Sequence, residues 1–188
     1  NKANYSAAFA TVAQSCCAVD CVFSNNTAYG INIVAGVKTI KLDNCEFYGN
    51  TAASSSAVVY DSDLKNCRLI SNSAGRIVQS GKASNCLFFK NTSTLNDVCS
   101  CLPVNCLFMS NVSGLRVVDS SSVKNSVFQG NVKPSGALVT TALGSTHSSL
   151  ASDSSGVAEE IGLVTSTATR VMKRPIRSAT FAPSSSGY

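Results

Sequence analysis

The sequence predicts an all-β protein, a right-handed parallel β-helix of about six to eight coils with three short strands in each coil. Three observations favour this fold. Charged residues are sparse, a motif of about 20 residues recurs six times, and apolar residues alternate with polar ones inside each copy.

The composition is typical of a surface made of strands and turns. Of the 188 residues, 44% are hydrophobic and only 13% are charged, whereas roughly a quarter of an average soluble chain is charged. Ser, Thr and Asn must therefore cover most of the surface, as they do on strands and turns. The net charge of +5 is dispersed and does not indicate nucleic-acid binding. No run approaches the roughly 18 apolar residues of a membrane helix, so we expect no membrane span.

The repeat is read from Asn-Cys pairs. The segment Asn44-Cys45-Glu46-Phe47-Tyr48-Gly49-Asn50 has five counterparts, and the last of them carries Ser126 in place of Cys. The Cys or Ser lies at positions 21, 45, 67, 86, 106 and 126, with spacings of 24, 22, 19, 20 and 20 residues. We expect the two longer spacings to contain insertions at corners of the coil.

Three columns of the repeat form a predicted structural ladder. A large apolar residue follows each Cys by two positions, and an Asn follows it by five. We expect the Phe column, in which Leu69 takes one place, to be continuous in the interior beside the Cys column. The ladder residues are Cys21, Cys45, Cys67, Cys86 and Cys106, then Phe23, Phe47, Phe88, Phe108 and Phe128, then Asn50, Asn72, Asn91, Asn111 and Asn131.

A unit of about 20 residues cannot bury its own apolar face, but stacked units can, with equivalent residues about 4.8 Å apart. A leucine-rich repeat has a similar period, but its Leu-x-x-Leu-x-Leu framework is absent. Helical repeats need roughly 33 or more residues and helix-forming residues. The parallel β-helix therefore remains.

The motif Phe47-Tyr48-Gly49-Asn50-Thr51-Ala52, with its variants over residues 6–131, resembles the repeats of bacterial polymorphic outer membrane proteins. It also looks like the Asn-Cys-x-Phe-x-x-Asn-x-Ala repeats of large β-helix surface proteins. The Gly-Gly-Ala-Ile half of the first family's repeat is missing here. The resemblance implies a right-handed β-helix, and it implies that family's adhesive role less directly.

Composition divides the chain into two parts. All Asn and Cys residues fall within residues 1–131, which we expect to be the β-helix repeats. Residues 132–188 have neither residue type and should form degenerate last coils and a C-terminal cap or extension. Ser149-Leu150 aligns there with Ser126-Val127.

The nine cysteines allow two interpretations. Cα atoms one coil apart lie within disulfide range, but side chains stacked in line suit the disulfide dihedral poorly. We expect the column to behave as small, mostly reduced hydrophobes. Cys16, Cys17, Cys99 and Cys101 lie off the column and are candidates for bridges or reactive thiols. No spacing is typical of zinc, and we expect neither a metal nor a cofactor.

The Asn columns have a structural interpretation. Asn tolerates the left-handed conformation and can bind neighbouring amides, so stacked Asn side chains can cap the turns of a solenoid. Four Asn also fit the glycosylation sequon, namely Asn4, Asn25, Asn91 and Asn111, and these matter only in a secreted eukaryotic protein.

The strongest catalytic constellation is Asp61 and Asp63, on the same side of one expected strand, with Lys82 or Lys65 nearby. Polysaccharide hydrolysis needs two carboxylates converging at about 5–9.5 Å, and a lyase needs clustered acids for Ca²⁺ and a basic residue. A solvated coil face explains the pair better. Asp43, Asp97 and Asp119 are scattered, and no catalytic residue is assigned.

The ends of the chain give weaker signals. His147 is expected at the surface. The basic run Arg170 to Arg177 is a solvated tail, a polyanion site or a segment that docks on acidic residues of its own chain. The first coil begins near Ala7 with no helix to cover its open edge. We therefore expect another polypeptide at the N-terminal coil, either the rest of a longer chain or a like subunit.

Three functions follow from these observations. The first is a non-catalytic structural or adhesive module of a secreted or cell-surface protein, binding carbohydrate through a long flat face. The second is a subunit of an extracellular filament built by end-to-end stacking. The third is a fragment of a polysaccharide lyase or hydrolase. The complete ladders, without a convergent catalytic set, favour the first.

Overall fold

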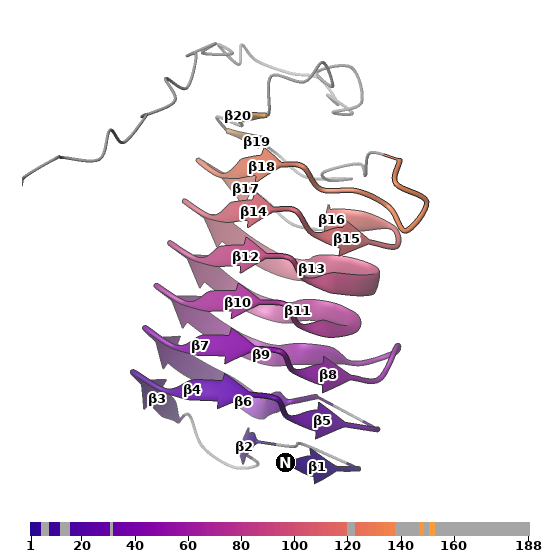
Figure 1. Cartoon of the computed structure of the whole chain (residues 1–188). Coiled ribbons are helices and arrows are strands. Elements are labelled where there is room, and N and C mark those ends of the chain that lie inside the picture. Colours follow the sequence, from indigo (N-terminus) through magenta and orange to yellow (C-terminus); the bar gives the residue numbers. More distant parts are fainter. Residues whose placement is uncertain are drawn as a thin grey trace, which may run out of the picture.

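The computed structural model describes residues 1–4, 8–11, 16–30, 32–119, 123–137, 147–148 and 151–152. The described residues form β-strands and no helix, and parallel strands stack coil on coil (Figure 1). The predicted parallel β-helix is confirmed, with about five turns instead of six to eight.

One sheet consists of short strands stacked one above another, each of three residues except β20, which has two. Its seven strands pair in parallel and in register, so that Phe47 lies opposite Leu69 and Leu69 opposite Phe88. The strands are β4 (Val22–Ser24), β7 (Glu46–Tyr48), β10 (Arg68–Ile70), β12 (Leu87–Phe89), β14 (Leu107–Met109), β18 (Val127–Gln129) and β20 (Ala151–Ser152).

The thirteen remaining strands form the second sheet, which wraps around the rest of each coil. On one side lie β1 (Lys2–Ala3), β5 (Thr27–Ala28), β8 (Thr51–Ala52) and β15 (Val112–Ser113). The others are β2 (Phe9–Thr11), β3 (Cys17–Val19), β6 (Val34–Asp43), β9 (Ala57–Lys65), β11 (Ser73–Ser84), β13 (Thr92–Val104), β16 (Arg116–Asp119), β17 (Val123–Lys124) and β19 (His147–Ser148).

The expectation of three short strands in every coil is only partly right. Three separate strands, β7, β8 and β9, make one coil, but β11 and β13 each join the second and third strands into one bent strand. A further corner lies inside each of β9, β11 and β13, at the left-handed residues Asp61 (φ 48°), Ser80 (φ 65°) and Ser100 (φ 51°). One such residue turns the chain while its neighbours stay paired with the next coil, so the ladder continues through the corner.

Two further corners of each coil also contain a left-handed residue. One is the residue just before the Cys column, where Asn66, Asn85 and Asn105 have φ of 53–55°. The other is the residue just before the buried Asn, where Gly49, Ser71 and Lys90 have φ of 53–61°. The turning role expected of Asn therefore belongs to the Asn before each Cys, since the buried Asn column does not share this conformation.

The buried Asn column is a continuous hydrogen-bond ladder from Asn26 to Asn131. In a typical step, the backbone N and the Nδ2 of Asn72 donate to Oδ1 of Asn91 at 3.0 and 3.1 Å. Nδ2 of Asn72 also donates to the Phe47 carbonyl at 2.9 Å. Each carboxamide thus satisfies an N–H and a carbonyl of the preceding coil inside the molecule, where water cannot, and its Nδ2 also donates to the Asn side chain of the next coil.

Phe side chains stack inside the coils. Phe88 and Phe108 have ring centroids 4.5 Å apart, and Phe108 and Phe128 have centroids 4.8 Å apart. Phe23 stacks on Phe47 at 4.8 Å, and Leu69 separates the two stacks. Phe47, Phe88 and Phe108 are fully buried. The interior is therefore a one-dimensional column in which each ring contacts the coil above and the coil below.

The start of the C-terminal part is a further coil. β19 pairs with β17, and β20 pairs with β18. Ala151 lies opposite Val127, so the expected alignment of Leu150 with Val127 is wrong by one residue. The rest of the predicted cap lies outside the described residues.

We expect Phe88→Ala to lower the free energy of unfolding by about 3–5 kcal/mol, because it removes a fully buried ring and leaves a cavity between two coils. Phe89→Ala is the matched control, since its side chain points outward and is only half-buried. Urea denaturation measures both. Equal losses for the two variants would contradict the stacked interior.

Candidate functional site

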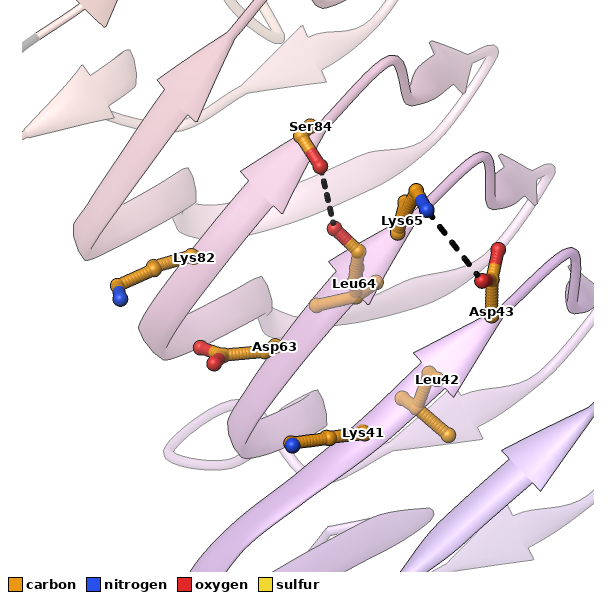
Figure 2. Close-up of a pocket in the computed structure, with 8 residues that line it drawn as sticks. All are labelled: Lys41, Leu42, Asp43, Asp63, Leu64, Lys65, Lys82 and Ser84. Carbon is orange, nitrogen blue, oxygen red and sulfur yellow. Dashed lines mark hydrogen bonds and ion pairs between the residues drawn. The ribbon is translucent and has the colours of Figure 1, made fainter.

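Two rows of outward side chains cross the sheet made by β6, β9 and β11. Lys41, Asp63 and Lys82 lie opposite one another on neighbouring strands. Asp43, Lys65 and Ser84 form the second row, two residues further along each strand. Figure 2 shows the three side chains of the first row projecting to the same side. The two rows line an open pocket together with Leu42 and Leu64.

The second row has internal partners. Nζ of Lys65 lies 3.8 Å from Oδ2 of Asp43, and Nδ2 of Asn66 donates to Oδ1 of Asp43 at 2.9 Å. The Lys65 and Asp43 side chains are 63% and 41% exposed, so this ion pair contributes little to stability. The Ser84 hydroxyl donates to the Leu64 carbonyl at 3.4 Å.

The first row differs from the second. Lys41 and Lys82 are exposed and Asp63 is half-buried, and within the described part of the chain no ion pair joins any of the three. This pocket therefore offers two ammonium groups and one carboxylate to a ligand.

The predicted constellation of Asp61 and Asp63 is brought together only in part. Asp61 has a left-handed backbone (φ 48°) at the corner, whereas Asp63 lies in the straight strand beyond it. The neighbours of Asp63 on the adjacent strands are lysines. Asp119 lies in a different part of the solenoid, where it accepts a hydrogen bond from Arg116 at 3.2 Å. The row therefore surrounds one carboxylate with cations, which suits binding of anions and hydroxyls better than two-carboxylate catalysis.

A second outward surface lies on the seven-stranded sheet. In β12 and β14 both residues that flank the buried Phe are apolar and half-buried, and β10 and β18 each contribute one such residue, Ile70 and Val127. Nζ of Lys90 lies 5.1 Å from the centre of the Phe89 ring. Sequence reasoning missed this surface, although Leu87-Phe88-Phe89 and Leu107-Phe108-Met109 are runs without an outward polar residue. Its side chains are Ile70, Leu87, Phe89, Leu107, Met109 and Val127.

Asp97, to which the sequence assigned no role, is a buried carboxyl group. Its side chain is 0% exposed, in the interior column of Ile77 and Val117. Burial raises the pKa of Asp97 to about 7, and the hydroxyls of Ser113 and Ser93 limit the rise. Neither hydroxyl makes a hydrogen bond of regular geometry with it. The position nine residues before each Cys, which holds Val58, Ile77 and Val117 in other coils, was the signal for burial.

No disulfide joins the nine cysteines. Cys45, Cys67, Cys86 and Cys106 are buried in one column, and the Cys67 thiol donates to the Lys65 and Leu42 carbonyls at 3.2 and 3.3 Å. Burial raises the pKa of Cys45 to about 11, which disfavours the reactive thiolate.

The cysteines off the column differ in exposure. Cys101 is buried, and burial raises its pKa to about 12. Cys17 is exposed, and Cys16 and Cys99 are half-buried.

Residues of other chemistry add no further site. Among the described residues, no three His, Cys, Asp or Glu side chains are placed to hold a metal ion, and no helix is long and apolar enough to cross a membrane. The run Arg170 to Arg177 and the side chain of His147 lie outside what the structure describes. The chain matches no protein-family model and no curated protein sequence.

We expect a thiol reagent to label Cys17 in the folded protein, but Cys45, Cys67 and Cys86 only after unfolding, because the latter are buried and Cys17 is exposed. Mass spectrometry of the unreduced, alkylated protein measures this. Disulfides among the three columnar cysteines would contradict the prediction.

We expect stability to fall by about 3 kcal/mol between pH 5 and pH 8 through Asp97, because its pKa of about 7 lies above the roughly 3.9 of an unfolded Asp. The folded state binds more protons than the unfolded state in this window, so the contribution is present at low pH and lost as pH rises through 7. Asp97→Asn should remove this loss in urea titrations at the two pH values. The control Asp119→Asn, which changes a partly exposed carboxylate, should retain it, and an unchanged pH dependence in Asp97→Asn would refute the assignment.

Proposed function

We propose that this chain is a non-catalytic, adhesive binding module of a secreted or cell-surface protein, and that it binds an extended carbohydrate chain on the face formed by β6, β9 and β11. The observation that carries this proposal is the row of Lys41, Asp63 and Lys82, which occupies equivalent positions in three successive coils beside an open pocket.

The chemistry of this face suits sugars. Lysine ammonium groups donate hydrogen bonds to ring and hydroxyl oxygens, and carboxylates accept from sugar hydroxyls. Strand pairing fixes where each side chain leaves the backbone, so little of the face must be ordered when a ligand binds. A linear ligand also fits, because equivalent groups repeat along the axis of the solenoid at the spacing between strands.

Two further points support a binding role over catalysis. Asp63, one of the two acids that line the pocket, has lysines as neighbours on both adjacent strands. The second acid of the pocket, Asp43, already accepts from Asn66 and lies 3.8 Å from Lys65. The resemblance to β-helix surface proteins is in keeping with an adhesive role outside the cell.

We expect the whole chain to retain glycans on an array, and Asp63→Ala with Lys82→Ala to weaken this binding at least about tenfold, because two charge-assisted contacts are lost. Lys2→Ala is the matched control, an exposed lysine on β1, outside this face. Absence of glycan binding together with end-to-end polymers in electron micrographs would replace the proposal by the filament hypothesis. Release of new sugar ends from a polysaccharide would replace it by an enzyme.

A further inference from the structure

We infer that the ligand of this face is an acidic polysaccharide with one acidic group per disaccharide, lying along the solenoid axis. Its acidic groups would contact Lys41 and Lys82, and the hydroxyls of the sugar between them would contact Asp63. This inference rests on the proposed function and adds the chemical class of the ligand.

The spacing of the row is the first argument. Neighbouring parallel strands lie about 4.8 Å apart, so equivalent atoms of Lys41 and Lys82, two strands apart, are separated by about 9.6 Å. An extended chain of β-linked pyranoses advances by nearly one strand spacing per sugar. Each coil therefore faces one sugar, and Lys41 and Lys82 face sugars that are one disaccharide apart.

The order of charges is the second argument. A polymer with an acid on every sugar would place an anion against Asp63, which is repulsive. A neutral polymer would leave both ammonium groups without an anion. Only a polymer with acids on alternate sugars pairs both lysines and leaves Asp63 free to accept hydroxyl hydrogen bonds.

The surroundings keep the row available to a ligand. Lys65, the cation of the second row on the same strand as Asp63, is the partner of Asp43 at 3.8 Å. The next residue along the first row is Leu102, which is 46% exposed and offers an apolar surface to a sugar ring. The row therefore presents cation, carboxylate, cation and apolar side chain over four successive coils.

Calorimetric titration at low ionic strength tests the inference with three β-linked oligosaccharides. These are hyaluronan, with a carboxylate on alternate sugars, polymannuronate, with a carboxylate on every sugar, and neutral cello-oligosaccharides. We expect hyaluronan to bind at least about tenfold more tightly than the other two, and this preference to weaken with added salt.

Variants locate the preference on the row. Lys41→Gln with Lys82→Gln should lower hyaluronan affinity about tenfold and cello-oligosaccharide affinity clearly less, because only hyaluronan loses two ion pairs. Asp63→Asn should narrow the difference in affinity between hyaluronan and polymannuronate, because it removes the repulsion between the Asp63 carboxylate and the acid on the facing sugar of polymannuronate. Lys2→Ala should change nothing, and circular dichroism should show that every variant keeps the β-helix.

The outcomes separate the two proposals. Equal affinity for hyaluronan and cello-oligosaccharides, or a preference unaffected by the double lysine variant, overturns the inference while glycan binding stands. Binding to no carbohydrate on the array or in the calorimeter overturns both the inference and the proposed function.

Discussion

The buried asparagine ladder is the interaction on which the rest of the structure depends. Where the chain leaves one sheet for the next, backbone groups face the interior and have no strand partner. The Asn91 carboxamide accepts a hydrogen bond from the Asn72 N–H at 3.0 Å and donates one to the Leu69 carbonyl at 2.8 Å. It thus provides the hydrogen bonds that a neighbouring strand or water would otherwise make. Without these bonds each corner would bury unsatisfied polar groups, at about 1–3 kcal/mol each. Because the corners are satisfied, the coil can close tightly enough for Phe88 and Phe108 to stack.

The same register that stacks the interior also arranges the exterior. A strand alternates its side chains, so a column fixed inside by Leu42 and Leu64 fixes the flanking columns of Lys41 with Asp63 and of Asp43 with Lys65 outside. The pocket is therefore a product of backbone pairing and needs no loop to form it. This is why an open surface with few internal side-chain bonds still presents its charges in a defined order.

Sequence reasoning predicted the fold because the ladder columns repeat one residue type at one position. Phe88 and Asn91 each have identical residues one coil away, and such repetition is visible without coordinates. The bent strands β11 and β13 were not predicted, since their corners use Ser80 and Ser100, which carry no left-handed signature. Asp97 and the row of Lys41, Asp63 and Lys82 lie in columns whose residue types differ from coil to coil. Asp97 is recognised as a core position only when the residues nine before each Cys are aligned, and the row only when the residues four before each Cys are aligned. Sequence reasoning instead paired Asp63 with Asp61 along one strand, and so it did not find the row.

Successive coils in the described part of the chain are also joined by the same backbone contact. The Asn66 N–H donates to the Ser84 carbonyl at 3.0 Å, and the equivalent bonds of Asn85 to Val104 and Asn105 to Lys124 are also 3.0 Å. Because these joints are alike, a segment running from one such asparagine to the next is interchangeable with its neighbours. Duplicating or deleting one segment in the gene would lengthen or shorten the solenoid by one coil and leave the other joints intact. The length of such a protein can therefore change during evolution in whole steps, an option closed to a globular core in which every element contacts several others.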